Sequence, residues 1–267
     1  MNCNGLIDLH CHILPGLDDG AADWEESLQM ARLAIAEGIS AIVATPHQLG
    51  AFDHNSAALI RSRCAELQAL LVQQQIPLEV RPGADIRIEP DIPERLRNGE
   101  VLTLADLGRY VLLELPHESS FPLGKLLQRL QAQEVVPVLS HPERNLELSR
   151  KPDAVRRLVE AGVVIQVTAG SFLGAFGPIA QAAAEQFLAR GLIHVVATDA
   201  HGARRRRPLI RRAFEHLVSR VGWDVAMLLC RDNPQAIIRG EAVASPSELE
   251  ESSQFFFGFL RWKRLAG

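Results

Sequence analysis

The feature that most constrains the fold of this 267-residue chain is a regular alternation of two hydrophobic patterns. Short runs rich in apolar and β-branched residues predict strands at Leu6–Leu9, Ala41–Thr45, Leu78–Arg81, Tyr110–Leu115, Val135–Ser140, Val163–Thr168 and His194–Thr198. Amphipathic stretches between them predict helices at Trp24–Glu37, Ala57–Gln74, Lys125–Gln133, Asp153–Ala161 and Ile179–Arg190. Such alternation is typical of βαβ units, which build a parallel sheet.

Seven predicted strands with crossover helices favour one closed barrel over two small domains. The run Val135–Leu139 is apolar on both faces, as expected for a parallel strand covered on both sides. A doubly wound open sheet is the alternative, but the chain lacks the glycine-rich phosphate-binding motifs that such sheets often carry. We therefore predict an α/β barrel over residues 1–240.

The pattern changes after Gly240, and we treat residues 241–267 as a tail. The segment Ser245–Ser253 predicts a short acidic helix with Ser245 as its N-cap. The end of the chain, Phe255–Leu265, is aromatic and basic. We favour docking of its phenylalanines on the barrel; the alternative is contact with a partner or a membrane surface, which basic and aromatic residues suit.

Composition excludes several classes of protein. A net charge of −4 predicts no surface for nucleic acid. No apolar run approaches the roughly 20 residues of a membrane span, and we expect no signal peptide. The four cysteines have no C-x-x-C spacing, which argues against zinc-ribbon and thioredoxin-type sites. We expect reduced thiols and a cytoplasmic location.

Histidines and acidic residues cluster where the predicted strands end. They are His10, His12, His47, Asp85, Glu114, His141, Asp199 and His201. Because the carboxyl ends of barrel strands share one rim, these side chains are expected to meet in one pocket. Unpaired acids and imidazoles on one rim would be costly to desolvate, and metal ions would remove that cost.

The first strand offers the clearest metal-binding pattern. His10 and His12 are two residues apart, so both rings are expected on one face of the strand. Asp8 would lie on that face and orient one ring. Cys11 would point the other way, as a buried packing thiol. Asp18-Asp19-Gly20 adds carboxylates in the first loop.

These motifs resemble the PHP (polymerase and histidinol phosphatase) superfamily, and more closely the bacterial manganese-dependent protein-tyrosine phosphatases of capsule and exopolysaccharide operons. The matching elements run in order from about residue 6 to residue 240 and are Ile7–Ile13, Asp18–Gly20, Thr45–His47, Gly83–Asp85 with Pro90-Asp91, Leu113-Glu114, Ser140–Arg144, Thr198–His201 and Asp232–Pro234. The D-D-G and H-P-E-R elements separate this branch from histidinol phosphatases and polymerase-linked domains.

The resemblance implies a distorted (β/α)7 TIM-like barrel, the PHP fold, with about three divalent metal ions at the carboxyl ends of the strands. The three implied ligand sets are His10, His12, Asp85 and Asp199; Asp85, Glu114 and His141; and Asp19, His47 and His201. Asp85 would bridge two metals. Relatives usually have Glu there, and the shorter Asp predicts a tighter bridge or weaker binding of one metal. Asp18 is an alternative to Asp19.

The resemblance also implies a metal-dependent protein-tyrosine phosphatase. Its substrate would be a phosphotyrosyl protein, namely a tyrosine autokinase controlling capsular or exopolysaccharide synthesis. Nitrogen and oxygen donors suit Mn²⁺, which we favour, and also Fe or Zn²⁺. The metals would lower the pKa of a shared water, and the resulting hydroxide would attack phosphorus.

Two arginines are candidates for phosphate binding and catalysis. Arg144, three residues after His141, would clamp phosphate with two N–H groups. Arg206 matches a phosphate-binding arginine of the resembled family, and the rest of the Arg204–Arg207 run is interpreted as solvated loop. His117 is a candidate substrate contact.

Other activities stay open or are disfavoured. No cysteine is followed by Arg six residues on, which argues against covalent thiol catalysis. A small-molecule phosphatase of the histidinol phosphate kind, or an exonuclease, would use the same site. A non-catalytic metal-binding module is the third possibility, against which the intact ligand set argues.

Overall fold

The structure is a computed structural model that describes residues 4–116 and 123–245. The predictions for His117 and for most of the tail, from residue 246, lie outside these ranges. The strands are β1 Leu6–Cys11, β2 Ile39–Ala44, β3 His47–Gln48, β4 Glu79–Pro82, β5 Asp85–Arg87, β6 Tyr110–Glu114, β7 Val136–Ser140, β8 Val164–Thr168 and β9 Val195–Ala197. Every pairing between them is parallel.

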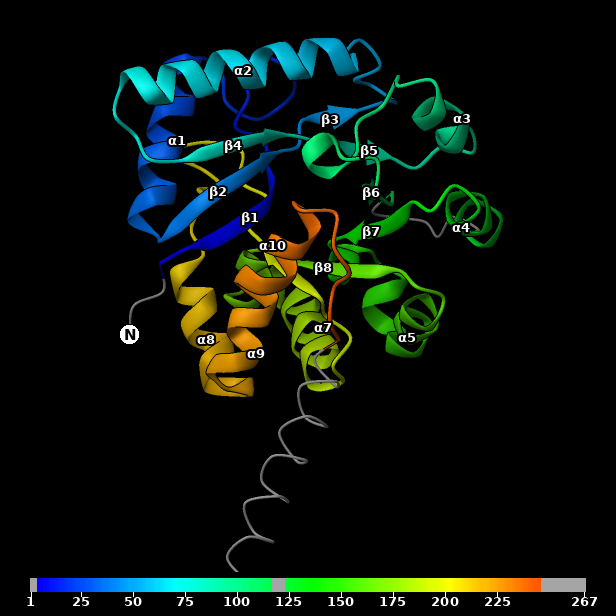
Figure 1. The fold of residues 1–267 in the computed structure, drawn as a ribbon. Coiled ribbons are helices and arrows are strands. Elements are labelled where there is room, and N and C mark those ends of the chain that lie inside the picture. The colour runs from blue at the N-terminus through cyan, green and yellow to red at the C-terminus, as the bar shows by residue number, and fades with distance from the viewer. Residues whose placement is uncertain (1–3, 117–122, 246–267) are drawn as a thin grey trace, which may run out of the picture.

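The strands form one closed barrel, although they are divided into the orders β1-β2-β4 and β3-β5-β6-β7-β8-β9. The division arises because β3 and β5 continue β2 and β4 after two-residue breaks at 45–46 and 83–84. The ring closes where Cys11 pairs with Ala200. There the Asp199 amide donates to the His10 carbonyl at 2.7 Å, and the His12 amide donates to the Ala200 carbonyl at 2.8 Å. The predicted (β/α)7 barrel is confirmed over the described residues (Figure 1).

Helices surround the strands (Figure 1). They are α1 Trp24–Ala36, α2 Ala57–Gln73, α3 Ile92–Arg97, α4 Gly124–Gln131, α5 Pro152–Glu160, α6 Ala169–Phe172, α7 Gly177–Ala189, α8 Arg211–Val221, α9 Trp223–Met227 and α10 Asn233–Ile237, with short helical turns η1 Leu104–Asp106, η2 Pro142–Arg144, η3 Leu148–Arg150 and η4 Leu228–Asp232. The five predicted helices are present. The helix α8 is not among the predicted helices, although its buried Ala213, Phe214 and Leu217 have helical spacing.

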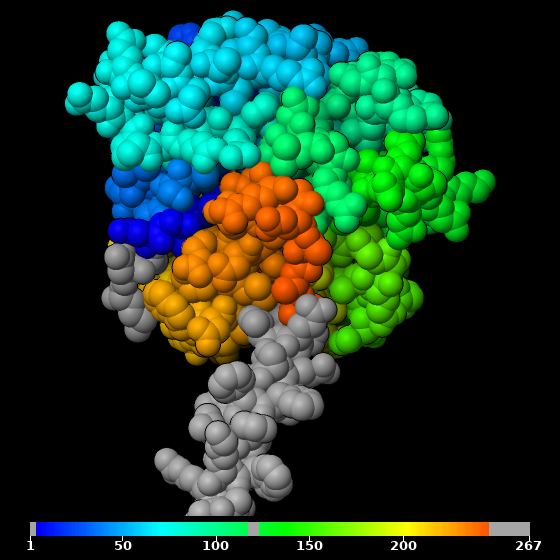
Figure 2. All heavy atoms as spheres, in the orientation of Figure 1, coloured from blue at the N-terminus to red at the C-terminus, as the bar shows by residue number. Residues whose placement is uncertain are grey.

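The interior of the barrel is apolar at one end and polar at the other. Val138, Leu112 and Val164 belong to an inner hydrophobic cluster, which also includes Ile237 and Ile238 from α10 and its end. The space-filling view shows the α10 segment, in orange, covering the barrel between the β1–β2 region and the green helices (Figure 2). Two residues further along the same strands come Ser140, Glu114 and Gln166, so the inner face becomes polar towards the carboxyl ends.

No helix in the described part of the chain is both long enough and apolar enough to cross a membrane.

Closure of the barrel predicts a structural role for Asp8. Its buried carboxylate accepts from the Thr198 amide at 2.8 Å and from the Thr198 hydroxyl, joining β1 to the end of β9. Asp8→Ala leaves these donors unpaired and is expected to lower the free energy of unfolding by roughly 2–3 kcal/mol. Urea unfolding in the presence of a chelator measures this loss without a contribution from metal binding.

Asp23→Ala is the control for this variant. Asp23 caps the exposed start of α1 by accepting from the Glu26 amide at 2.9 Å, and its loss should cost about 1 kcal/mol. A smaller effect of Asp8→Ala than of Asp23→Ala would contradict the assigned role in closure.

Candidate metal centre

The predicted ligands converge at the carboxyl ends of the strands in four overlapping groups. In each group the donor atoms lie within 4.8 Å of one another, and the groups are His12, Asp19, His47 and His201; His10, His12 and Asp85; His10, His141 and Asp199; and His47, Asp85 and Glu114. All nine residues predicted from the sequence as metal ligands therefore lie in one connected cluster.

Asp199 faces the imidazoles with a single carboxylate oxygen. Its Oδ1 lies 3.4 Å from His10 Nε2, 3.5 Å from His12 Nε2 and 3.5 Å from His201 Nδ1. Ligand atoms about 2.1 Å from one cation lie roughly 3.0–3.5 Å apart. The spacing around Asp199 is therefore that of donors arranged around a shared metal ion.

Asp85 provides the test of whether the residues fit metal ions. Its Oδ2 lies 3.4 Å from His10 Nε2 and 3.5 Å from His47 Nδ1, since the β3–β5 register places His47 opposite Asp85. Asp85 is fully buried, and this oxygen has no hydrogen-bond partner among the described residues. A buried carboxylate oxygen in this state is costly unless a cation binds it, so the donor set fits divalent metal ions.

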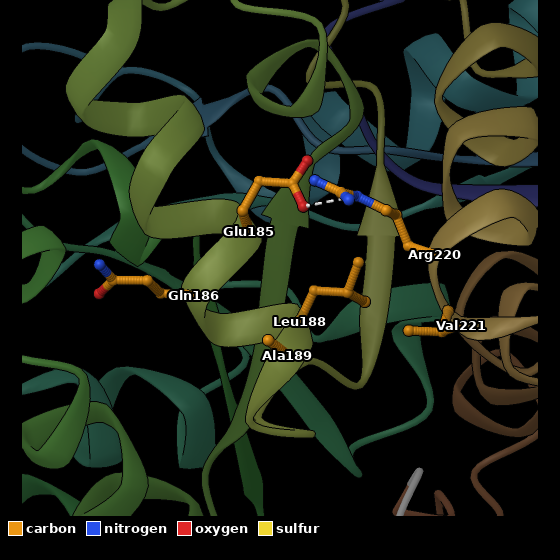
Figure 3. Close-up of a pocket in the computed structure, with 6 residues that line it drawn as sticks. All are labelled: Glu185, Gln186, Leu188, Ala189, Arg220 and Val221. Carbon is orange, nitrogen blue, oxygen red and sulfur yellow. Dashed lines mark ion pairs between the residues drawn. The ribbon is translucent and has the colours of Figure 1, made fainter.

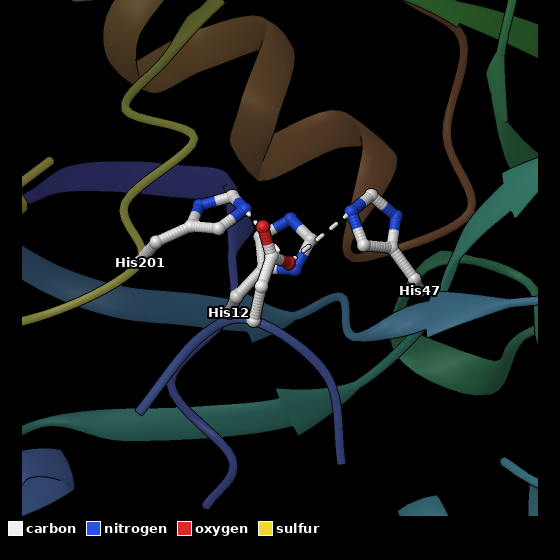
Figure 4. Close-up of side chains that lie close together, drawn as sticks. His12, His47 and His201 are labelled. Atoms are coloured by element: carbon white, nitrogen blue, oxygen red, sulfur yellow. Dashed lines mark ion pairs between the residues drawn. The ribbon is translucent and has the colours of Figure 1, made fainter. Parts of the chain in front are cut away.

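The most accessible group combines Asp19, in the first loop, with His47 and His201, which lie at strand ends. Asp19 Oδ1 lies 3.4 Å from His201 Nε2 and 3.6 Å from His47 Nε2. Figure 4 shows the rings of His12, His47 and His201 approaching one another from three separate segments. The structure thus brings together the implied third ligand set and adds His12 to it.

Glu114 connects two parts of the cluster. Its Oε1 lies 3.5 Å from His141 Nε2, and its Oε2 lies 3.7 Å from His47 Nδ1. The implied second set is therefore brought together around Glu114, with His47 as an additional neighbour.

Hydrogen bonds to the far nitrogens orient two of the rings. Gln166 Oε1 lies 3.0 Å from His10 Nδ1, and Asp18 Oδ2 lies 2.7 Å from His12 Nδ1. Both contacts leave Nε2 directed at the cluster. The prediction that Asp8 orients a ring is wrong. The β1–β2 register shifts between Asp8 and Cys11, the simple alternation of faces fails there, and Asp8 bonds Thr198 instead.

Burial and neighbouring charges shift the pKa values of several groups in the cluster. Burial acts to lower the pKa of His12, but Asp18 and Asp199 overcome it and raise this pKa to about 10. Burial and the neighbouring Asp85 raise the pKa of Glu114 to about 7. Burial and the positive charge of His12 lower the pKa of His47 to about 4. Strongly perturbed groups that face one another are typical of functional sites.

Both candidate phosphate-binding arginines reach the other oxygen of Asp199. Arg144 Nη1 donates to Asp199 Oδ2, and Arg206 Nη2 donates to the same oxygen at 2.5 Å. Arg206 has a positive φ of 45°. Its neighbours Arg204, Arg205 and Arg207 are exposed. Asp199 therefore directs one oxygen to the imidazoles and the other to two guanidinium groups.

Two aromatic side chains at this rim are not among the residues predicted from the sequence. Phe52 stacks on His47 with ring centroids 5.2 Å apart, and Phe176 lies beside Arg144 and Arg206. Both belong to connecting segments outside the recognised motifs, so no periodicity pointed to them. Gln166 was missed as well, although its position on β8, two residues after the inner-facing Val164, could have indicated it.

The cysteines in the described ranges argue against thiol chemistry in this centre. The three cysteines in the described ranges, Cys11, Cys64 and Cys230, are buried and unpaired. Burial raises the pKa of the Cys11 thiol well above its usual value. As predicted, Cys11 packs in the core between strands and helices.

A separate pocket lies between α7 and α8 (Figure 3). It is lined by Glu185, Gln186, Leu188, Ala189, Arg220 and Val221. An ion pair of 3.3 Å joins Glu185 to Arg220 across it. The pocket shares no residue with the metal cluster.

Comparison with known proteins places this chain in a family. The family model described as capsular polysaccharide synthesis, CpsB/CapC, matches residues 6–239. The chain belongs to this family. The resemblance inferred from the motifs is thereby confirmed.

The matches to individual CpsB/CapC proteins extend over nearly the whole chain. The tyrosine-protein phosphatase YwqE of Bacillus subtilis is 35% identical over 255 residues, which cover 95% of this chain and all of YwqE. The tyrosine-protein phosphatase CpsB of Streptococcus pneumoniae is 28% identical over 244 residues, covering 89% of this chain and all of CpsB.

Solved structures agree with the fold. A structure from the crystallographic work on YwqE and CpsB, described there as unique metal-dependent tyrosine phosphatases, superposes with a TM-score of 0.86 at 36% identity and covers 90% of this chain and 97% of its own. The phosphotriesterase homology protein of Escherichia coli has a TM-score of 0.60 at 14% identity, covering 89% of this chain and all of its own, and supports the barrel fold alone.

The orientation of His12 by Asp18 predicts an effect on metal affinity in this CpsB/CapC chain. Asp18→Asn removes the carboxylate charge that holds the ring and should weaken Mn²⁺ binding about 10- to 100-fold. Calorimetric titration of chelator-treated protein measures the affinity. Asp53→Asn, in an exposed loop position, should have no effect. Equal affinities for the two variants would argue against the orienting role.

The raised pKa of His12 predicts that metal binding releases protons. With a pKa of about 10, this ring is protonated at pH 7 when no metal competes for Nε2. A metal must displace that proton, so the apparent Mn²⁺ affinity should rise as pH increases from 6 to 8. Calorimetry in buffers of different ionisation enthalpy counts the protons, and identical heats in all buffers would contradict the prediction.

Proposed function

We propose that this chain is a metal-dependent tyrosine-protein phosphatase that holds about three divalent ions in its His and Asp/Glu cluster. The observation that carries the proposal is the position of Asp199, whose Oδ1 faces three imidazoles while its Oδ2 accepts from two arginines. A metal-binding region and a phosphate-binding region are thereby joined through one side chain. The naming of YwqE and CpsB as tyrosine-protein phosphatases supports this activity.

The donor set supports Mn²⁺ as the metal, with Fe or Zn²⁺ as the other candidates. Every proposed ligand is an imidazole nitrogen or a carboxylate oxygen, and no thiolate is among them. We assign the nine ligands to the three sets that the family resemblance implies. When bound, the ions supply Lewis acidity for phosphate oxygens and make a nearby water acidic enough to serve as the nucleophile.

Arg144 and Arg206 bind and orient the phosphate. Each guanidinium offers planar N–H donors that match two phosphate oxygens. Because both groups are held at Asp199, a phosphate that they bind would lie at the edge of the metal cluster. Tyrosine leaves as a phenolate with a pKa of about 10, which is a good enough leaving group to need no assigned general acid.

The substrate is a phosphotyrosyl protein, and we propose a tyrosine autokinase that controls capsular or exopolysaccharide synthesis. The family description, which names capsular polysaccharide synthesis, supports this context. The rim that carries Asp19, His47 and Arg206 is partly exposed, as a site for a protein-borne phosphate requires.

The direct test compares substrates and metals. Protein stripped with chelator and reloaded with Mn²⁺ is expected to hydrolyse phosphotyrosyl peptides and aryl phosphates, and chelator should abolish this activity. Histidinol phosphate and DNA 3′ ends should be poor substrates. Activity confined to histidinol phosphate or DNA ends would contradict the assignment as a tyrosine phosphatase. A metal-loaded protein that hydrolyses none of these substrates would favour a non-catalytic metal-binding module.

Removing either phosphate-binding arginine is expected to lower the activity without lowering the metal content. Arg144→Ala or Arg206→Ala removes charge-assisted hydrogen bonds and should lower kcat/KM for a phosphotyrosyl peptide by roughly 100-fold. Elemental analysis should find the same Mn²⁺ content. Arg205→Ala is the matched control, since it removes an exposed guanidinium from the same loop and should change kcat/KM less than about 3-fold. Equal losses for Arg205→Ala and Arg206→Ala would contradict the assignment of Arg206.

A further inference from the structure

Phe176, in the connection between α6 and α7, lies against both phosphate-binding arginines. The centroid of its ring is 4.4 Å from Cζ of Arg144 and 5.9 Å from Cζ of Arg206. Both distances fall within the roughly 6 Å over which a guanidinium is attracted to an aromatic face. One ring therefore contacts two cations that come from different parts of the chain.

These two cations need such a partner because they repel each other. Both donate to the same oxygen of Asp199, and the side chain of Arg144 is only 11% exposed, so little water screens its charge. The negative face of an aromatic ring offsets part of this repulsion without taking up any N–H donor. A carboxylate in the same place would instead compete with phosphate for those donors.

The ring is held in place by the backbone beneath it. A Cβ on Gly170 would lie 3.1 Å from Cε2 of Phe176, so the absence of a side chain at Gly170 lets the ring lie close to α6. The Gly170 carbonyl accepts from the amides of Leu173 and Ala175 at 3.1 and 3.0 Å, which turns the connection back across α6.

The same segment also anchors the backbone of Arg144. The buried carboxylate of Glu143 accepts from the Thr168 amide at 3.0 Å and from the Ser171 hydroxyl at 2.7 Å. The turn that carries Arg144 is thus bonded to the end of β8 and to α6, and Phe176 lies in the connection that follows α6. The backbone and the guanidinium of Arg144 therefore both contact the same region of the chain.

We propose that Phe176 is a positioning residue that aligns Arg144 and Arg206 into a single phosphate clamp. The inference rests on the proposed function for the role of the two arginines. Phe176 acts on phosphate through them and takes no part in metal binding. Its removal therefore weakens phosphate binding and leaves the metal content intact.

The test measures phosphate binding separately from turnover. Inorganic phosphate is titrated calorimetrically into the Mn²⁺-loaded protein, and KM and kcat are measured on p-nitrophenyl phosphate. Phe176→Leu should weaken phosphate binding about 10-fold and raise KM more than it lowers kcat, with unchanged Mn²⁺ content. Phe176→Tyr keeps the aromatic face and should stay within about 2-fold of the native chain.

Leu173→Ala is the matched control, because it shortens an exposed apolar side chain of the same connection. It should leave phosphate affinity unchanged. A thermal unfolding scan of each variant checks that the fold is retained. If Phe176→Leu unfolds, Gly170→Ala takes its place, since the added methyl displaces the ring and should weaken phosphate binding in the same direction.

A double-mutant cycle distinguishes a positioning role of Phe176 from a general disturbance of the structure. In an Arg144→Ala background, Phe176→Leu should weaken phosphate binding by less than 3-fold, because half of the clamp is already gone. The proposal would be overturned if Phe176→Leu kept the native phosphate affinity, or if Phe176→Leu and Phe176→Tyr lost equal amounts of phosphate affinity. Full additivity of the two substitutions in the cycle would overturn it as well. Phosphate binding that depends on Phe176 without hydrolysis of phosphotyrosyl peptides would instead refute the proposed function and leave this inference standing.

Discussion

The carboxylate of Asp199 is the interaction on which the rest of the site depends. It can face imidazoles with one oxygen and guanidiniums with the other only because its backbone is fixed against β1, where its amide donates to the His10 carbonyl at 2.7 Å. The contact that closes the barrel therefore also brings the residues of the site together. A chain whose first and last strands failed to meet would separate His10 and His12 from Asp199 and from both arginines.

Much of this arrangement could be predicted because strand position carries geometric information. Once the apolar runs are interpreted as parallel strands, the eight histidines and acidic residues at their carboxyl ends are assigned to one rim without any knowledge of long-range contacts. Asp19 lies in the first loop, and its place among the ligands is implied only by the family resemblance. The prediction failed where local regularity fails. Asp8 was placed beside His10 by strict alternation, but the register shift after Asp8 breaks that alternation and leaves its carboxylate on Thr198. Phe176 could not be found, since the position of a connecting segment depends on packing that no short pattern encodes.

The metal centre also bears on the stability of the barrel. Asp85, His10 and His12 are fully buried, and Asp85 Oδ2 has no hydrogen-bond partner among the described residues. Ions that bind these residues in the folded chain and not in the unfolded chain stabilise the fold by mass action. Bound ions would thus stabilise the polar end of the barrel, whereas the opposite end is filled by the apolar side chains of Leu112, Val138 and Ile237.

The exposure of Asp19 distinguishes it from the buried carboxylates of the cluster. Its side chain is 61% exposed, whereas Asp85 and Asp199 are at most 2% exposed. An ion held partly by Asp19 would be open to solvent on that side, whereas an ion held by Asp85 would be enclosed by buried side chains. Ions bound at these two residues would therefore exchange with solvent at different rates. The ion at Asp19 would be the first to dissociate when the concentration of free metal falls.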